Sequence, residues 1–179
     1  NVHDPHNIGA VIRSCDAVGI QEVYVLYTED QLTQARLEQL STTSTGVKKW
    51  MNIHFFRDAE TCFKEVRKKY DLVLATHLDK EAKDLHSLNL TKKIAFLFGN
   101  EHEGISEKTL TFADGNFVIP QFGMVQSLNI SVACAVTLYE ALRQRKASDM
   151  YTQDIDNASA DNKALFEYFI DKHNQSYLR

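Results

Sequence analysis

The sequence lacks the features that mark several common classes of protein. No apolar run approaches the roughly 20 residues that a membrane-spanning helix needs. No signal-peptide pattern opens the chain, although residue 1 is Asn rather than Met. The three cysteines (Cys15, Cys62 and Cys134) include no Cys-x-x-Cys pair, which disfavours a disulfide framework and a zinc ribbon. These absences predict a cytoplasmic protein with buried free thiols and no membrane partner.

Glycine is scarce, and its spacing excludes several nucleotide-binding loops. The seven glycines contain no Gly-x-Gly pair, so the dinucleotide fingerprint and the usual open-sheet methyltransferase loop are both absent. Gly99 and Gly104 have the spacing of a phosphate-binding loop, but Ile105 and Ser106 follow where Lys and Ser/Thr are needed. No Gly-x-Ser-x-Gly motif exists, which excludes the common α/β hydrolase. The histidines form no clustered ligand pattern, so no metal site is predicted.

The charge of the chain leaves nucleic-acid binding undecided. The net charge is −4, which argues weakly against a uniformly basic surface. Phosphate binding needs clustered charge on one face rather than a basic average. Four local basic clusters occur, at residues 48–49, 67–69, 92–93 and 143–146. Each is more often a solvated end of a helix or strand than a contact with RNA.

Alternating strand and helix patterns predict one α/β domain over residues 1–150. Apolar runs at residues 22–27, 71–76, 93–98 and 116–120, with a weaker one at 50–56, favour strands buried in a mainly parallel sheet. Helical spacing occupies residues 8–18, ended by Gly19, residues 59–70, and residues 128–145, with Ser127 as the expected N-cap. Residues 151–179 turn polar and form an expected tail with a short helix at 164–169.

Three unusual polar segments lie beside these apolar runs. They cover residues 1–13, 98–104 and 119–131. Taken singly, they have ordinary explanations as a helix start, a glycine-bounded turn and a capped helix. Together they place polar loops next to strands, where open α/β sheets bind their ligands.

The three segments, in this order, resemble the three motifs of the SpoU family in the knotted SPOUT methyltransferase superfamily. The run Met-Val-Gln-Ser-Leu-Asn-Ile-Ser-Val-Ala at residues 124–133 is the most specific of them. The resemblance covers about residues 1–150 and is greatest to members that methylate guanosine 18 of tRNA. Such members normally have a further strand before the position of Asn1, so an N-terminal piece is expected to be missing.

The resemblance implies a fold, a cofactor and an assembly. The fold is an α/β sheet with helices on both faces and a C-terminal deep trefoil knot. Family members bind S-adenosylmethionine in the knot, act as homodimers and methylate ribose 2′-hydroxyls of RNA. By position, the resemblance places four residues in the cofactor pocket: Thr76, Gly99, Ile119 and Leu128.

The resemblance also carries over five chemical residues, namely Asn7, Arg13, Glu101, Ser127 and Asn129. A guanidinium stays protonated in proteins, so a direct base role for Arg13 is physically demanding. We expect Arg13 to hold an RNA phosphate and lower the pKa of the ribose hydroxyl. Asn7, Ser127 and Asn129 would fix the geometry. Glu101 has an equal alternative, as a structural carboxylate that holds its own turn.

Two other functions stay open at this point. One is the same reaction on ribosomal RNA or on another tRNA nucleoside. The other is a non-catalytic RNA-binding dimer. A pure binder has no need of Asn7, Arg13, Ser127 and Asn129 together, which favours the enzyme.

Overall fold

The strands of the protein form two parallel sheets. The computed structural model describes residues 1–2, 4–28, 50–125, 127–151, 156 and 158–177, so the basic cluster at 48–49 lies outside the described residues. The smaller sheet pairs β1 (Glu22–Leu26) with β2 (Asn52–Phe56). The larger sheet has the order β4 (Lys83–Asp84), β6 (Gly115–Val118), β3 (Leu72–Thr76), β5 (Ile94–Leu97). The predicted α/β class is confirmed, but the described strands form two sheets instead of one.

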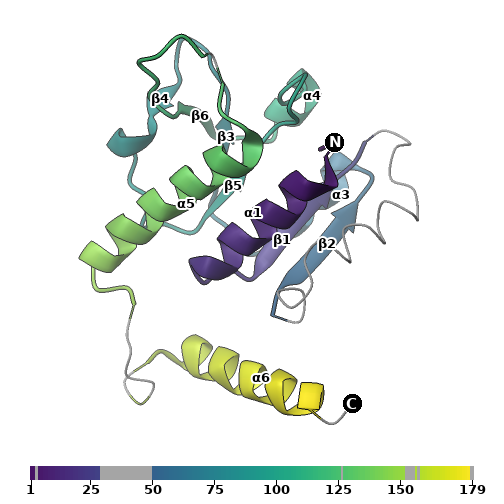
Figure 1. Cartoon of the computed structure of the whole chain (residues 1–179), viewed down its shortest axis with the longest axis vertical. Coiled ribbons are helices and arrows are strands. Elements are labelled where there is room, and N and C mark those ends of the chain that lie inside the picture. The colour runs from purple at the N-terminus through teal and green to yellow at the C-terminus, as the bar shows by residue number, and fades with distance from the viewer. Residues whose placement is uncertain (3, 29–49, 126, 152–155, 157, 178–179) are drawn as a thin grey trace.

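The described part of the chain has four longer helices, three of which lie against the sheets (Figure 1). They are α1 (Pro5–Ala17), α3 (Ala59–Arg67), α5 (Ile130–Ala147) and α6 (Ala160–Tyr177). The chain also contains a short α4 (Glu107–Leu110) and a 3-10 helix η1 (Leu85–Ser87). The sequence did not predict α4, η1 or β4, because segments of two to four residues show no periodicity. Helix α6 is longer than the predicted 164–169, since polar positions hide its helical spacing.

Local capping determines where helices α1 and α5 begin. The Asp4 carboxylate accepts a hydrogen bond from the His6 N–H at 2.8 Å, and Pro5 opens α1. The N-cap of α5 is Asn129, whose side chain accepts from the Ser131 N–H at 2.9 Å. The predicted N-cap Ser127 is therefore wrong. Both residue types are good caps, and only the tertiary position selects Asn129.

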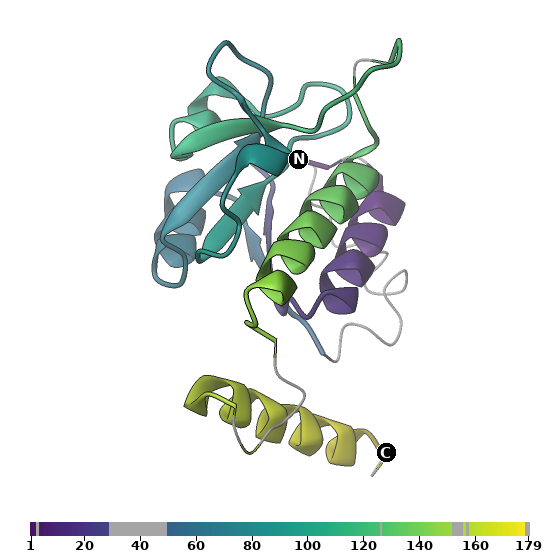
Figure 2. The ribbon, with the colours of Figure 1, turned by 90° about the vertical axis from the view of Figure 1, so that its left-hand side faces the viewer.

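Helices cover both faces of the sheets. Helices α1 and α5 lie side by side on one face, and α3 lies on the other (Figures 1 and 2). Ile12 and Cys15 of α1 pack with Cys134 and Leu138 of α5 in one core cluster. A second cluster joins Ala59, Cys62, Phe63 and Val66 of α3 to Val73 of β3. All three cysteines are buried and free, which confirms the prediction from the sequence.

A cleft of about 460 Å³ separates the two sheets. Both β1 and β5 line it, together with apolar side chains of α1 and α5. Among the described strands, β1 pairs with β2 alone and β5 pairs with β3 alone, so each turns a backbone edge toward the cleft. Asn7, Gly99 and Asn100 are also among its lining residues. The cleft therefore borders two of the polar segments that the sequence singles out.

The C-terminal half of α5 is anchored by a polar cluster around Glu140. The Glu140 carboxylate accepts hydrogen bonds from Arg143 Nε, Arg143 Nη2 and Gln144 Nε2, each at 2.8 Å. Gln144 also accepts from Leu90 N at 2.9 Å and donates to Leu88 O at 3.0 Å. Arg145 Nε donates to Leu90 O at 3.1 Å. These bonds tie α5 to the backbone that precedes β5.

We expect Glu140→Gln to weaken the fold in a pH-dependent way. The hydrogen bond from Arg143 is the main cause that lowers the Glu140 pKa from 4.5 to about 2. A lowered folded-state pKa stabilises the protein above pH 4.5, and this stabilisation is lost as pH falls toward 2. At pH 7 the variant should lose about 2 kcal/mol of unfolding free energy. Urea denaturation from pH 7 to pH 3 measures the difference in unfolding free energy between the variant and the wild type.

The control for this experiment is Glu81→Gln, because Glu81 lies on the exposed segment before β4. That variant should follow the wild-type curve at every pH. A constant gap between Glu140→Gln and wild type across the range would contradict the role given to the Glu140 charge.

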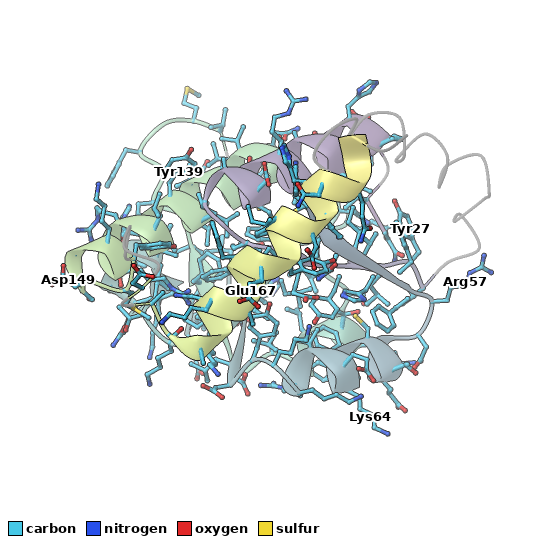
Figure 3. All side chains as sticks on the ribbon, turned by 90° about the horizontal axis from the view of Figure 1, so that it is seen from below. Tyr27, Arg57, Lys64, Tyr139, Asp149 and Glu167 are labelled. Carbon is cyan, nitrogen blue, oxygen red and sulfur yellow. The ribbon has the colours of Figure 1, made fainter. Side chains whose placement is uncertain are left out.

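Helix α6 stands apart from the two sheets. It lies below the other helices in Figure 1, and Figure 3 views it from that side. Its Phe169 ring meets Trp50 edge to face, with ring centroids 5.8 Å apart, and its His173 ring stacks on Trp50 with centroids 6.1 Å apart. Within the described part of the chain, no helix combines the length and apolar character needed to cross a membrane.

Candidate active site

A chain of hydrogen bonds joins the three polar segments through Asn7. Asn7 Nδ2 donates to Glu101 Oε1 at 2.5 Å, and Asn129 Nδ2 donates to Asn7 Oδ1 at 3.1 Å. Asn7 lies in the first turn of α1, Glu101 in the turn after β5, and Asn129 at the N-cap of α5. The structure thus brings together three of the five predicted chemical residues, although they are far apart in the sequence.

The turn that carries Glu101 is held by the neighbouring Asn100. Asn100 Oδ1 accepts from His102 N at 2.9 Å and from Glu103 N at 2.6 Å. The Asn100 backbone also exchanges hydrogen bonds with Gly104, at 2.9 and 3.3 Å. The sequence analysis missed Asn100, although an Asn that opens a glycine-bounded turn is a recognisable signal. Because Asn100 binds these two N–H groups, Glu101 can present an oxygen to Asn7.

Gly99 allows this turn to close on itself. A Cβ atom at Gly99 would lie 2.2 Å from Gly104 C and 2.6 Å from Ile105 N. Both atoms belong to the backbone, so neither can move aside cheaply. Any side chain at residue 99 must therefore push apart the two ends of the turn.

We expect Gly99→Ala to open the turn and displace Glu101 from Asn7. The clash should lower the unfolding free energy by about 1–3 kcal/mol, as overpacked positions do. The matched control is Gly123→Ala, because a Cβ there meets no atom within 4 Å, and it should change stability by less than about 0.5 kcal/mol. Thermal unfolding of both variants checks the prediction. Equal melting temperatures for both would refute the close approach.

Three of the four predicted cofactor residues lie at one edge of the larger sheet. Thr76 ends β3, Gly99 follows β5, and Ile119 directly follows β6. Because β5, β3 and β6 are parallel neighbours, their carboxyl ends meet at the same edge. Thr76 Oγ1 donates to Leu97 O at 3.3 Å across that edge. This is where open parallel sheets bind ligands.

The fourth predicted cofactor residue, Leu128, lies next to the N-cap of α5. Leu128 is half-buried, whereas Ser127 is exposed. Phe122 and Met124, in the segment before them, are fully exposed. Of the four predicted cofactor residues, Gly99 lines the cleft between the sheets, and Thr76, Ile119 and Leu128 lie outside that lining. Thr76, Gly99 and Ile119 therefore lie at the carboxyl edge of the larger sheet, and of the four predicted residues only Gly99 also lines the cleft.

Arg13 lies on α1 but away from the hydrogen-bonded chain. It is exposed and lines a shallow depression with His6, Ala10 and Tyr139. Tyr139, labelled on α5 in Figure 3, is 53% exposed. Among the described residues, no hydrogen bond or ion pair of the Arg13 guanidinium is found. This cation is therefore available to an external anion.

Two of the basic clusters serve the fold. Arg67 binds both Asp114 oxygens, at 2.6 and 3.0 Å, and Lys69 pairs with Glu22 at 2.7 Å. In the cluster at 143–146, Arg143 and Arg145 make the contacts described above. These two clusters therefore take part in contacts within the fold. Among the described residues, no group of three or more His, Cys, Asp or Glu side chains could hold a metal ion.

Comparison with known proteins assigns the chain to a family. The sequence model of the SpoU rRNA Methylase family matches residues 1–139. The chain belongs to the SpoU family. This match includes all five predicted chemical residues and confirms the resemblance drawn from the three motifs.

Individual SpoU proteins agree in sequence and in fold. The tRNA (guanosine(18)-2′-O)-methyltransferase of Thermus thermophilus is 41% identical over 151 residues, which cover 84% of this chain and 75% of that protein. The A. aeolicus TrmH/SpoU tRNA-modifying enzyme superposes with a TM-score of 0.73 at 32% identity, covering 94% and 83% of the two chains. The SpoU methyltransferase AviRb of Streptomyces viridochromogenes, solved in complex with AdoMet, gives 0.71 at 26% identity, covering 82% and 58%.

Proposed function

We propose that this SpoU protein is an S-adenosylmethionine-dependent RNA ribose 2′-O-methyltransferase that acts on guanosine 18 of tRNA. The observation that carries the proposal is the hydrogen-bonded chain from Glu101 through Asn7 to Asn129. It gathers the polar groups of three motifs beside the carboxyl edge of a parallel sheet. The choice of target rests on the similarity to the Thermus thermophilus enzyme.

The residues at the carboxyl edge fit the proposed cofactor. Ile119 packs on the Phe117 cluster, and with Leu128 it offers apolar groups on which an adenine can lie. Thr76 and Gly99 supply backbone and hydroxyl groups that can read the polar edge of the base. When bound, S-adenosylmethionine supplies a methyl group already activated by its sulfonium.

The protein must then align the ribose hydroxyl with that methyl carbon. Arg13 holds an RNA phosphate, and its positive charge lowers the pKa of the nearby hydroxyl. The side-chain amides of Asn7 and Asn129 hold each other in place, because Asn129 donates a hydrogen bond to Asn7. Ser127 and Glu101 complete the set, with the Glu101 carboxylate fixing the position of Asn7.

The assembly and topology of the family also belong to the proposal. We place a C-terminal trefoil knot in the domain of residues 1–150, followed by a separate tail at 151–179. We place the protein in the cytoplasm and expect a homodimer whose interface includes α5. In support, Val132 and Tyr139 on α5 are 47% and 53% exposed. Sedimentation equilibrium should give twice the monomer mass, and a monomer at micromolar concentration would refute the dimer.

Two alternatives define the test of this function. The family description names rRNA, so ribosomal RNA is a second possible substrate, and another tRNA nucleoside is a third. A non-catalytic RNA-binding dimer would bind RNA and transfer nothing. The experiment incubates the protein and labelled S-adenosylmethionine with unmodified tRNA and rRNA transcripts, then maps the 2′-O-methyl site. Label at guanosine 18 of tRNA supports the proposal, and label elsewhere or none overturns it.

A further inference from the structure

Ser131 binds the side chain of Asn129 through two donors. Its backbone N–H donates to Asn129 Oδ1 at 2.9 Å, and its hydroxyl donates to the same oxygen at 2.6 Å. A carboxamide oxygen only accepts, so the hydroxyl must be the donor. Ser131 is half-buried in the first turn of α5.

These two donors fix the direction of the Asn129 amide. If the amide turned over, its NH₂ group would face the Ser131 N–H, which can only donate. Asn129 Nδ2 must therefore point toward Asn7 Oδ1, 3.1 Å away. The Asn7 amide is set in turn, because its NH₂ group then faces the Glu101 carboxylate. Ser131 at one end of the hydrogen-bonded chain and Glu101 at the other therefore require the same orientation of the two amides.

We propose that Ser131 is a positioning residue for ribose methylation. Its hydroxyl holds the Asn129 amide, and through Asn129 it orients Asn7 within the site. The inference rests on the proposed function, because it assigns Ser131 to the same reaction. Among the described residues, the hydrogen bonds of the Ser131 hydroxyl and N–H go to Asn129 and not to Arg13 or the residues assigned to the cofactor, so its influence on the reaction passes through the Asn129 and Asn7 amides.

The hydroxyl and the backbone N–H make separable contributions. Replacing Ser131 with Ala removes the 2.6 Å bond and keeps the 2.9 Å bond that caps α5. The helix should therefore form as before, while the orientation of Asn129 becomes less strictly fixed. One lost hydrogen bond of ordinary strength corresponds to a change of about tenfold in the correctly oriented population.

The test compares Ser131→Ala and Ser131→Thr with a control on the same helix, Ser148→Ala. The Ser148 hydroxyl donates to Gln144 O at 3.0 Å at the other end of α5. Ser131→Ala should slow single-turnover methyl transfer to tRNA about tenfold, with unchanged cofactor affinity and melting temperature. Ser131→Thr keeps a hydroxyl and should restore the rate. An Ala variant at the wild-type rate, or a Thr variant as slow as Ala, overturns the inference.

A second readout does not depend on turnover. The side-chain amide NMR signals of Asn7 and Asn129 should broaden in Ser131→Ala and remain sharp in Ser148→Ala. Unchanged signals in both variants overturn the inference. If wild-type protein methylates no RNA, the proposed function fails, and these spectra still decide whether Ser131 orients the two amides.

Discussion

Arg13→Ala is expected to reduce methyl transfer by about 10³-fold while cofactor affinity stays within about twofold of wild type. An aligned general acid–base or charge-stabilising group is worth about 10²–10⁴ in rate. Arg13 is exposed, and the depression that it lines includes none of Thr76, Gly99, Ile119 and Leu128. The Arg13→Ala change should therefore leave cofactor affinity unchanged and remove the positive charge that is proposed to lie beside the ribose.

Single-turnover methyl transfer and calorimetric cofactor titration separate these two effects. Arg13→Lys keeps the charge but lacks the planar pair of donors that matches a phosphate, and it should recover part of the rate. The matched control is Lys64→Ala, which removes a cation from α3 on the opposite face of the sheet (Figures 2 and 3). Methyl transfer by Arg13→Ala at the wild-type rate would refute the role given to Arg13. An equal loss of rate in Lys64→Ala would refute it as well.

Replacing Asn7 with Asp should produce the second large effect. Asn7→Asp replaces the donor that faces Glu101 with a second carboxylate, 2.5 Å from the first. Two carboxylates at that distance cannot both stay ionised without repulsion. The variant should lose about 10²–10³ in kcat/KM, equivalent to about 3–4 kcal/mol of transition-state stabilisation. Glu101→Gln removes the charge but keeps an acceptor for Asn7, so its loss should be smaller, about tenfold.

The double variant N7D/E101Q tests whether the two residues act as a linked pair. The amide introduced at residue 101 can donate to the carboxylate introduced at residue 7, and Asn129 Nδ2 can still donate to that carboxylate. The link is then restored with its charge moved to residue 7, and most of the activity should return. Steady-state kinetics and melting temperatures of the three variants give the coupling. Asp16→Asn, an exposed charge change on the same helix, is the control. Full activity of Asn7→Asp would rule out the link.

Much of the fold follows from local patterns in the sequence. The strands at 22–26, 72–76, 94–97 and 115–118 lie within one or two residues of the predicted runs, since buried parallel strands are short and apolar. The three predicted long helices are also present. Helices α1 and α3 carry apolar residues at helical spacing, and no Pro or Gly interrupts α5. The three motifs were sufficient to identify the SpoU family.

Contacts between distant residues were decided by tertiary structure. Asn7 is separated by 94 residues from Glu101 and by 122 residues from Asn129. Their side chains meet because α1 packs against α5 through Ile12, Cys15 and Leu138. The N-cap of α5 is likewise Asn129 and not Ser127. No local pattern contains this information.

The sequence by itself therefore determined most of the longer strands and helices, the α/β class and the family. These properties depend on periodicity and on motifs within a few residues of one another. The tertiary structure decided that the strands divide into two sheets around a cleft, that Asn100 and Gly99 shape the Glu101 turn, and that Arg13 lies apart from the Asn7 chain. Each of these depends on how far-separated backbone segments approach, which is set by packing of the whole core.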